Sequence, residues 1–285
     1  MITEDVQKRF LYFVEERENI RLSREVFDYS PPFTEDKVLQ EFRFCNINRE
    51  HDAVTRWVAK NVRSKLSGGN VMYLICAMLT CRIFNEPETL KLMDFSVFDI
   101  EAWFIVAKRK QKEGERVLRG AYMMPAHGIN GKGVGVVDYY ERVTLELSTR
   151  DALYEAKTLR AVAEEMDNVR GLGVFLANQV ISDLRYTDNF KYSSDWETFI
   201  LCGPGTRRGI NRFDGVSTEK IKSQDFYVQR ILQIKEMIMP QVSRLLQDYY
   251  RDINNLSNSF CEFDKYERAL DAVSQYKQPR LRKWK

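Results

Sequence analysis

Long apolar runs are missing from this sequence of 285 residues. The longest, residues 71–79, is far shorter than the roughly 20 residues that cross a bilayer. The N-terminus also lacks the order of basic, apolar and small residues that marks a secretory signal. These absences argue against a membrane-embedded or secreted class, and we expect a cytoplasmic protein that makes no membrane contact.

Closely spaced metal ligands are equally scarce. The chain has five cysteines but no C-x-x-C pair, and its two histidines are His51 and His127. Disulfide frameworks, zinc sites and four-cysteine iron–sulfur clusters all need such spacing. The sequence therefore predicts neither a metal site nor a bound cofactor.

An excess of one charge is also absent. The 44 Lys and Arg residues nearly balance the 41 Asp and Glu residues, so a net charge of +3 gives little support for a nucleic-acid partner. Two local basic features remain, Arg207-Arg208 and the tail 277–285, which either meet phosphates or are simply solvated. With 44% hydrophobic and 30% charged residues, the chain is expected to fold.

Helical periodicity dominates what is present. Apolar positions recur every three to four residues in segments 49–66, 97–112 and 151–166, and residues 71–84 are apolar all round. A long helix is expected over 217–250, bent near Pro240. Residues 120–148 differ because five glycines alternate with aromatic and β-branched residues. We therefore predict a mainly α fold with a small Gly-rich loop or β-hairpin insertion.

The sharpest local pattern is a G-x-G turn between two predicted helices. Gly171, Leu172 and Gly173 follow the helix that ends near Met166 and precede a second helical stretch that reaches Tyr186. Backbone N–H groups at such a helix start bind phosphate oxygens without reading sequence. An ordinary turn between helices is the alternative interpretation.

A carboxylate follows this turn at a suggestive distance. Asp195 lies 22 residues beyond Gly173, after the second helix of the hairpin. The arrangement resembles helix-hairpin-helix DNA glycosylases, and the resemblance implies that Asp195 is the catalytic carboxylate. Phe175 stands where bifunctional members of that superfamily carry a lysine, which implies a monofunctional enzyme that leaves an abasic site. The alternative is that Asp195 caps a helix beside Trp196.

A closer resemblance covers almost the whole chain and rests on five ordered motifs. They are ERENIR (16–21), FRFCNINREHD (42–52), GVFLANQ (173–179) followed by DL (183–184), GPGTRRG (203–209) and FDKYE (263–267). Together they resemble the α-glutamyl/putrescinyl thymine pyrophosphorylase family, a branch of the glycosylase superfamily. The resemblance implies either thymine hypermodification in phage DNA or excision of such hypermodified bases as an anti-phage defence.

Two further groups of candidate residues fit a nucleotide pocket. Gly205, Thr206, Arg207 and Arg208 are expected to bind a phosphate, with a tight turn and solvated arginines as the alternative. A base pocket is the other expectation, with capping, packing and satisfaction of buried backbone as the alternatives. The residues predicted for this base pocket are Phe44, Asn46, Arg49, Asp52, Gln179, Asp183 and Trp196. On the first helix, Glu16, Arg17 and Arg21 share a face and are expected to form surface ion pairs.

The leading hypothesis is a two-lobed DNA glycosylase that flips out and excises a bulky 5-modified pyrimidine. Its lobes are expected over 1–119 and 149–250, with the insertion at 120–148 and a basic tail at 251–285. Its expected partners are DNA and a monovalent cation at the hairpin. The second hypothesis is a transferase that attaches an amino acid or polyamine to phosphorylated or pyrophosphorylated 5-hydroxymethyluracil in DNA, and the third is a DNA-binding module without activity.

Overall fold

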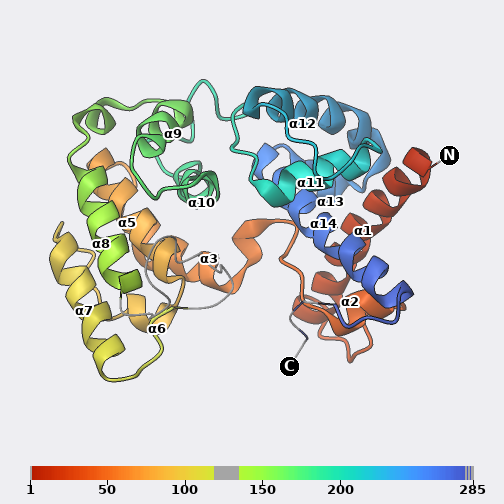
Figure 1. Ribbon diagram of the computed structural model, residues 1–285, viewed down its shortest axis with the longest axis horizontal. Coiled ribbons are helices and arrows are strands. Elements are labelled where there is room, and N and C mark those ends of the chain that lie inside the picture. The colour runs from red at the N-terminus through yellow and green to blue at the C-terminus, as the bar shows by residue number, and fades with distance from the viewer. Residues whose placement is uncertain (1, 119–134, 280, 282, 284–285) are drawn as a thin grey trace. The chain divides into compact units, whose positions relative to one another are not determined.

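The computed structural model describes residues 2–118, 135–279, 281 and 283, and within them the protein is helical without a strand (Figure 1). The chain divides into two compact units, Met1–Asp52 with Ile200–Lys285 and Ala53–Phe199. The expected lobes were continuous segments, whereas the first unit takes both ends of the chain. No described helix is both long enough and apolar enough to cross a membrane.

Helix α14 is the central helix of unit 1. It spans Ile253–Ser274, and it is packed against α1 (Ile2–Glu25), α2 (Lys37–Glu41), α11 (Pro204–Phe213), α12 (Gln224–Ile238) and α13 (Arg244–Tyr250). Short 3₁₀ segments lie at Arg49–His51 and Met239–Gln241. Phe10 from α1 stacks on Phe260 from α14 with 4.5 Å between ring centroids. Because both rings are completely buried, this pair stabilises the packing of α1 against α14.

Glycines allow α11 to approach α14 closely. A Cβ at Gly209 would lie 2.1 Å from the Phe260 carbonyl oxygen, and one at Gly205 would lie 2.4 Å from the Cys261 sulfur. Both distances are shorter than the contacts that Cβ atoms make in real structures. These glycines of the GPGTRRG motif therefore serve the packing of two helices.

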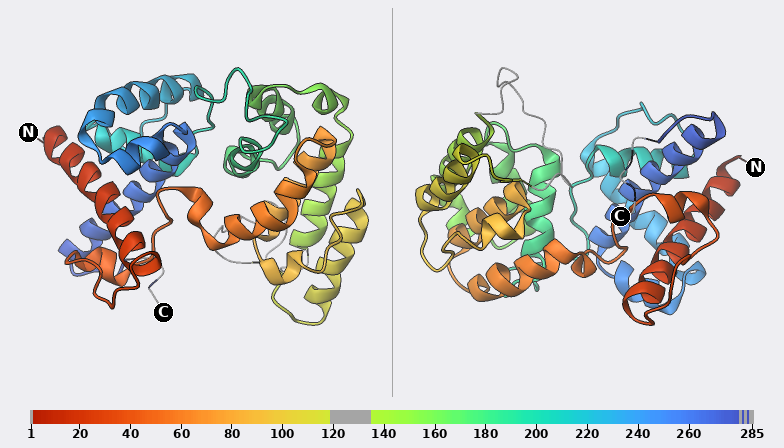
Figure 2. Two further views of the ribbon diagram at one scale, coloured as in Figure 1. Left: turned by 180° about the vertical axis from the view of Figure 1, so that it is seen from behind. Right: turned by 90° about the horizontal axis from the view of Figure 1, so that it is seen from below.

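Unit 2 is built around the apolar helix α5 (Val71–Phe84), which packs against α8 (Gly135–Ser148) and α10 (Val174–Leu184) (Figure 2). It begins with α3 (Ala53–Val58), a π-helical turn at Ala59–Arg63 and α4 (Ser64–Leu66). The other elements of the unit are α6 (Pro87–Leu90), α7 (Ile100–Lys112), a 3₁₀ segment at Asp151–Glu155 and α9 (Leu159–Asp167). Helices α9 and α10 are the expected helical hairpin.

The structure confirms the mainly α class and corrects two expectations. Residues 135–148 form α8, so the prediction of a loop or β-hairpin is wrong there, and residues 120–134 lie outside the described part. The helix expected over 217–250 is divided into α12 and α13, with the 3₁₀ turn around Pro240 between them. The finer expectation of a glycosylase-like fold remains a prediction.

Candidate functional site

The glycine corner of the hairpin presents backbone to solvent. Gly171 has a φ of +107°, which favours glycine, and a Cβ there would also lie 1.7 Å from the Tyr139 hydroxyl. Leu172 is buried and anchors the corner, while Gly171 and Gly173 are exposed. A Cβ at Gly173 would meet nothing within 4 Å. The two glycines before α10 are therefore exposed to solvent, and phosphate binding there stays a prediction.

Asp195 is held by the first helix of this hairpin. Its two carboxylate oxygens accept hydrogen bonds from the backbone N–H groups of Leu159, at 3.1 Å, and Arg160, at 2.8 Å. The Thr158 hydroxyl oxygen accepts a third, from the N–H of Ala161. These are the donors that a helix start leaves without partners, so Asp195 caps the distant start of α9 (Leu159–Asp167) and not a helix beside Trp196.

Trp196 is similarly engaged. Its indole N–H donates to the carbonyl oxygen of Arg185 at 2.9 Å, and the Arg185 guanidinium lies 4.7 Å from the ring centroid. Arg185 is completely buried and donates to the carbonyl oxygen of Phe199. In this structure Trp196 therefore stabilises the segment after α10 through its contacts with Arg185.

The polar residues expected on α10 lie inside unit 2. Asp183 is 1% exposed and accepts from Nε and Nη2 of Arg82, both at 2.5 Å, and from Nη1 of Arg63 at 3.4 Å. Gln179, one turn earlier, is also buried. The sequence reasoning missed both arginines, although Arg82 was visible as a cation within an otherwise apolar helix. The π-helical turn, a rare feature that is frequent at functional sites, ends at Arg63.

Residues 42–52 pack on α1 and α14 of unit 1. Arg17 is 2% exposed and donates through Nη2 to the carbonyl oxygens of Phe44, at 3.1 Å, and Cys45, at 3.3 Å. Its Nε and Nη1 have no hydrogen-bond partner among the described residues. The N–H of Cys45 donates to Glu262 at 2.9 Å. Arg17 is therefore buried among backbone carbonyls, and the expectation that it forms a surface ion pair is wrong.

The predicted base-pocket residues of this segment make similar contacts. The Asp52 carboxylate accepts from the N–H of Asn46 at 3.2 Å, and the N–H of Arg49 donates to the Asn255 side chain at 3.2 Å. Phe44 and Arg49 are buried. Packing and capping account for these contacts, and their role in reading a base stays a prediction.

Glu262 links this segment to α14 as an ionised carboxylate. Burial raises its pKa, but the Lys265 ammonium, the N–H of Cys45 and the Arg17 charge together lower the pKa below its ordinary value. Lys265 contacts the carboxylate directly, and its own pKa is raised by Glu262 against the effect of burial. The pair is therefore charged at neutral pH.

The GPGTRRG motif forms the start of helix α11, not a tight turn. Gly203 is the N-cap, and Gly205 and Thr206 follow within the first turn. The Thr206 hydroxyl donates to the carbonyl oxygen of Ser257 at 3.0 Å. Arg207 donates to the carbonyl oxygen of Cys202 and to Gln224, while Arg208 donates to Asp264 at 2.9 Å.

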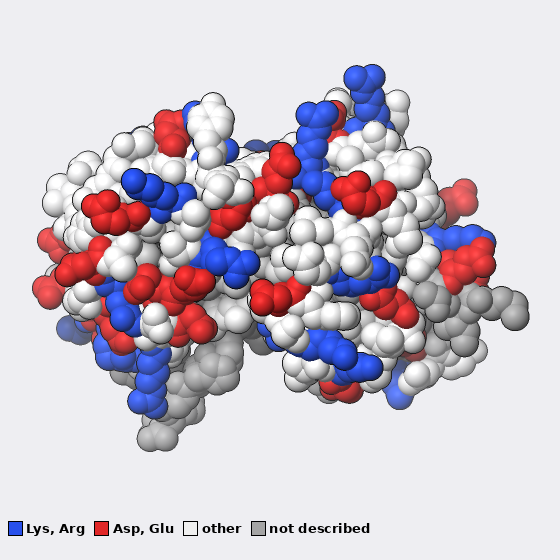
Figure 3. Space-filling view, turned by 90° about the horizontal axis from the view of Figure 1, so that it is seen from above, with Lys and Arg blue, Asp and Glu red and all other residues white. Residues whose placement is uncertain are grey.

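The predicted site residues thus fall into two groups. Gly171, Leu172, Gly173, Gln179, Asp183, Asp195 and Trp196 belong to unit 2, whereas Phe44, Asn46, Arg49, Asp52, Gly205, Thr206, Arg207 and Arg208 belong to unit 1. On the face drawn in Figure 3, basic and acidic side chains are interspersed. The described residues contain no cluster of metal ligands, and nothing supports the expected monovalent cation.

Fold and contacts define a helical protein with several buried arginine–carboxylate clusters and a carboxylate, Asp195, that caps a helix. The chain belongs to the family described as 5-hmdU DNA kinase, helical domain, whose model matches residues 4–275. It is 25% identical over 224 residues to the 5-hmdU DNA kinase of Bacillus phage SP10, a match that covers 70% of this chain and 35% of that protein. The chain thus corresponds to about a third of its relative's length. No solved structure matches it.

These findings overturn the glycosylase hypothesis. A kinase transfers a phosphoryl group to its acceptor, whereas a glycosylase hydrolyses the bond between base and sugar. Family and relative are both described as a kinase, so excision of a base and the hydrolase class are wrong. The contacts of Asp195 agree, because both of its oxygens already bind backbone N–H groups.

Proposed function

We propose that this chain is the DNA-binding helical part of an enzyme that phosphorylates 5-hydroxymethyldeoxyuridine in DNA. The observation that carries the proposal is the family match over residues 4–275. In the reaction, the 5-hydroxymethyl oxygen forms a bond to the terminal phosphorus of a nucleoside triphosphate. The bond to the diphosphate leaving group breaks, and the hydroxyl proton passes to a base or to water. The sugar–base bond stays intact.

The hairpin supports a role in binding the substrate. An exposed glycine corner, anchored by the buried Leu172, offers backbone donors that suit a sugar-phosphate chain of any sequence. An enzyme that acts on one base in different sequence contexts has to hold the DNA backbone without reading the neighbouring bases. Specificity then has to come from contacts to the 5-hydroxymethyl group itself.

The test combines binding with product analysis. Duplexes with thymine or with 5-hydroxymethyluracil at the same position are titrated with the protein, and the 5-hydroxymethyluracil duplex is then incubated with a nucleoside triphosphate and Mg²⁺. We expect this chain to bind the modified duplex more tightly, and the enzyme of which it is the helical part to yield, after enzymatic digestion, a nucleoside heavier by one phosphoryl group. Equal affinity for both duplexes without phosphorylated nucleoside, or the appearance of alkali-labile abasic sites, contradicts the proposal.

A second candidate is a transferase that acts one step later. It would attach an amino acid or polyamine to the phosphorylated or pyrophosphorylated base, with the phosphate as leaving group. The five ordered motifs that resemble the α-glutamyl/putrescinyl thymine pyrophosphorylase family support it. In the same assay, a mass gain that requires an added amine and a phosphorylated substrate distinguishes this reaction from phosphorylation.

A further inference from the structure

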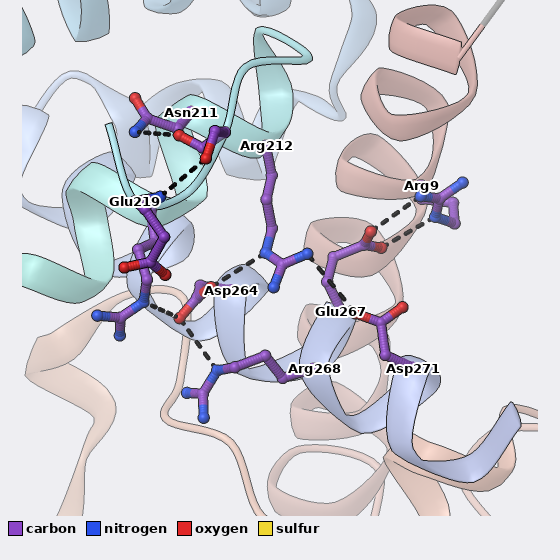
Figure 4. Close-up of polar contacts among 10 residues, drawn as sticks. Arg9, Asn211, Arg212, Glu219, Asp264, Glu267, Arg268 and Asp271 are labelled. Carbon is purple, nitrogen blue, oxygen red and sulfur yellow. Dashed lines mark hydrogen bonds and ion pairs between the residues drawn. The ribbon is translucent and has the colours of Figure 1, made fainter. Parts of the chain in front are cut away.

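Three arginines share one buried carboxylate on unit 1. Asp264 on α14 is completely buried, and it accepts from Nε of Arg208 at 2.9 Å, Arg212 at 3.0 Å and Arg268 at 3.2 Å. Arg208 and Arg212 are one turn apart on α11, and Arg268 follows Asp264 by one turn on α14. Figure 4 shows the Asp264 carboxylate between Arg212 and Arg268.

The positive charge of this cluster exceeds what Asp264 requires. One guanidinium would neutralise a buried carboxylate, and each additional one is repelled by its neighbours. A second acid, Asp271, lies 3.7 Å from Nη1 of Arg212 and is largely exposed. The nearby Arg9 is neutralised by its two bonds to Glu267 and adds no charge. One positive charge thus remains on Arg208 and Arg268.

These two arginines also have unused donors. Each guanidinium carries five N–H groups, and both bind Asp264 through Nε. No other hydrogen-bond partner of either residue lies in the described part of the chain. Their side chains are 36% and 47% exposed, so the terminal nitrogens reach solvent while Nε is fixed. A guanidinium fixed in this way is suited to bind two oxygens of one phosphate.

We propose that Arg208 and Arg268, positioned by Asp264, form a binding site for a backbone phosphate of the DNA substrate. This inference rests on the proposed DNA-binding function. A phosphodiester carries one negative charge, which matches the charge left on the cluster. Since the contacts are to a phosphate, the site contributes affinity and register without sequence preference.

The first experiment measures the salt dependence of binding to a short DNA duplex by fluorescence anisotropy. Each phosphate contact contributes about 0.9 to the slope of log K against log salt concentration. We expect the double variant Arg208→Gln, Arg268→Gln to bind about tenfold more weakly and to lower the slope by about 1. Arg244→Gln with Arg251→Gln is the matched control, because it removes the same charge from exposed positions of the same unit. An equal change in both variants overturns the site.

The second experiment uses the sign of the effect of Asp264→Asn. This variant adds one positive charge, so general electrostatic attraction predicts tighter DNA binding. The proposed site predicts weaker binding, since Asp264 no longer orients the arginines. A thermal unfolding curve of each variant shows that binding is measured on folded protein. Tighter binding by folded Asp264→Asn overturns the inference.

Two further outcomes separate the possible failures. If the wild type binds no DNA, the proposed function fails, and this site fails with it. If the wild type binds DNA but the double variant keeps the wild-type slope, only the site is wrong. Calorimetric titration with inorganic pyrophosphate identifies a different ligand: binding that the double variant abolishes, with DNA affinity unchanged, assigns the arginines to a free phosphate and overturns the DNA assignment.

Discussion

For a single residue such as Asp195, the role of the carboxylate depends on which groups donate hydrogen bonds to its oxygens. Asp195 contacts the backbone N–H groups of Leu159 and Arg160, which lie 36 and 35 positions earlier in the chain. A sequence pattern shows that an acid follows a hairpin at a certain distance, but it does not show which donors the fold brings to it. The motif was thus visible, whereas its capping role required the tertiary structure.

Substitution of Asp195 is expected to affect stability and not catalysis. Loss of a capping side chain costs about 1 kcal/mol, so Asp195→Ala should lower the free energy of unfolding by about that amount. Asp195→Asn keeps an acceptor oxygen and should cost less. Urea unfolding measures the stabilities, and DNA binding by both variants should equal that of the wild type. A folded Asp195→Asn that loses DNA binding contradicts this prediction.

Single polar residues also show where sequence reasoning reaches its limit. Arg82 was recognisable as an exception in an apolar helix, yet its partner Asp183 lies 101 positions away. Gly171 was singled out at the hairpin corner, where its φ of +107° favours glycine, but the Tyr139 hydroxyl that lies against it belongs to α8. The sequence shows residue types and their local spacing. It does not show which side chains come into contact, because that depends on how the helices pack.

At the scale of elements, helices are predictable where apolar positions follow the helical period. Helix α8 illustrates how this signal can be overlooked: Val137, Tyr140, Val143 and Leu147 are buried at intervals of three to four residues. The glycines before and at its start suggested a loop instead. Boundaries depend on caps, and α12 begins only after Ser223, whose hydroxyl oxygen accepts from the N–H of Phe226.

The pairing of α5 with α10 depends on a buried ion pair. Asp183→Asn should destabilise the protein by about 3–5 kcal/mol, because it removes the buried negative charge that Arg82 and Arg63 both contact. The double variant Arg82→Met, Asp183→Leu removes both charges of this pair and should recover part of that loss, since Arg63 keeps its charge and also loses its contact with Asp183. Chemical denaturation of the wild type and the single and double variants measures the coupling. A double variant as unstable as Asp183→Asn contradicts the prediction.

The contact between residues 42–52 and α14 should respond to acid. Because the pKa of Glu262 is lowered in the folded protein, its stabilising effect is complete above the ordinary carboxyl pKa of about 4.3. That effect is lost as the pH falls through the lower pKa of the folded state. Glu262→Gln should therefore cost about 2 kcal/mol at neutral pH, less than a fully buried pair because the Lys265 side chain is 34% exposed.

Unfolding free energies of the wild type and Glu262→Gln, measured from neutral pH to about pH 3, test this expectation. The two curves should converge in the acidic range. Glu88→Gln, which removes a carboxylate paired with Lys91 on the surface, is the control and should follow the wild type throughout. A constant difference between Glu262→Gln and the wild type at all pH values would show that shape, and not charge, stabilises this contact.

For the molecule as a whole, net charge is a poor guide to function. The total of +3 gives little indication of a nucleic-acid partner, and acidic and basic side chains are mixed on the face in Figure 3. The charges that we propose for DNA binding are local. Three arginines contact Asp264, and the hairpin places backbone N–H groups at a helix start. DNA affinity should therefore depend on a few defined positions, as the salt-dependence experiment measures.

The division into two units leads to a prediction about folding. Unit 2, Ala53–Phe199, is one continuous segment with its own buried helix, α5. A fragment with these residues should be helical and unfold cooperatively, because it is a compact unit with its own buried helix. A fragment of residues 1–52 is the control: Phe10 and Phe13 of α1 pack on rings of α14, which it lacks, so it should remain unfolded. Circular dichroism with thermal unfolding distinguishes the two, and a 53–199 fragment without a cooperative transition would show that its helices depend on the rest of the chain.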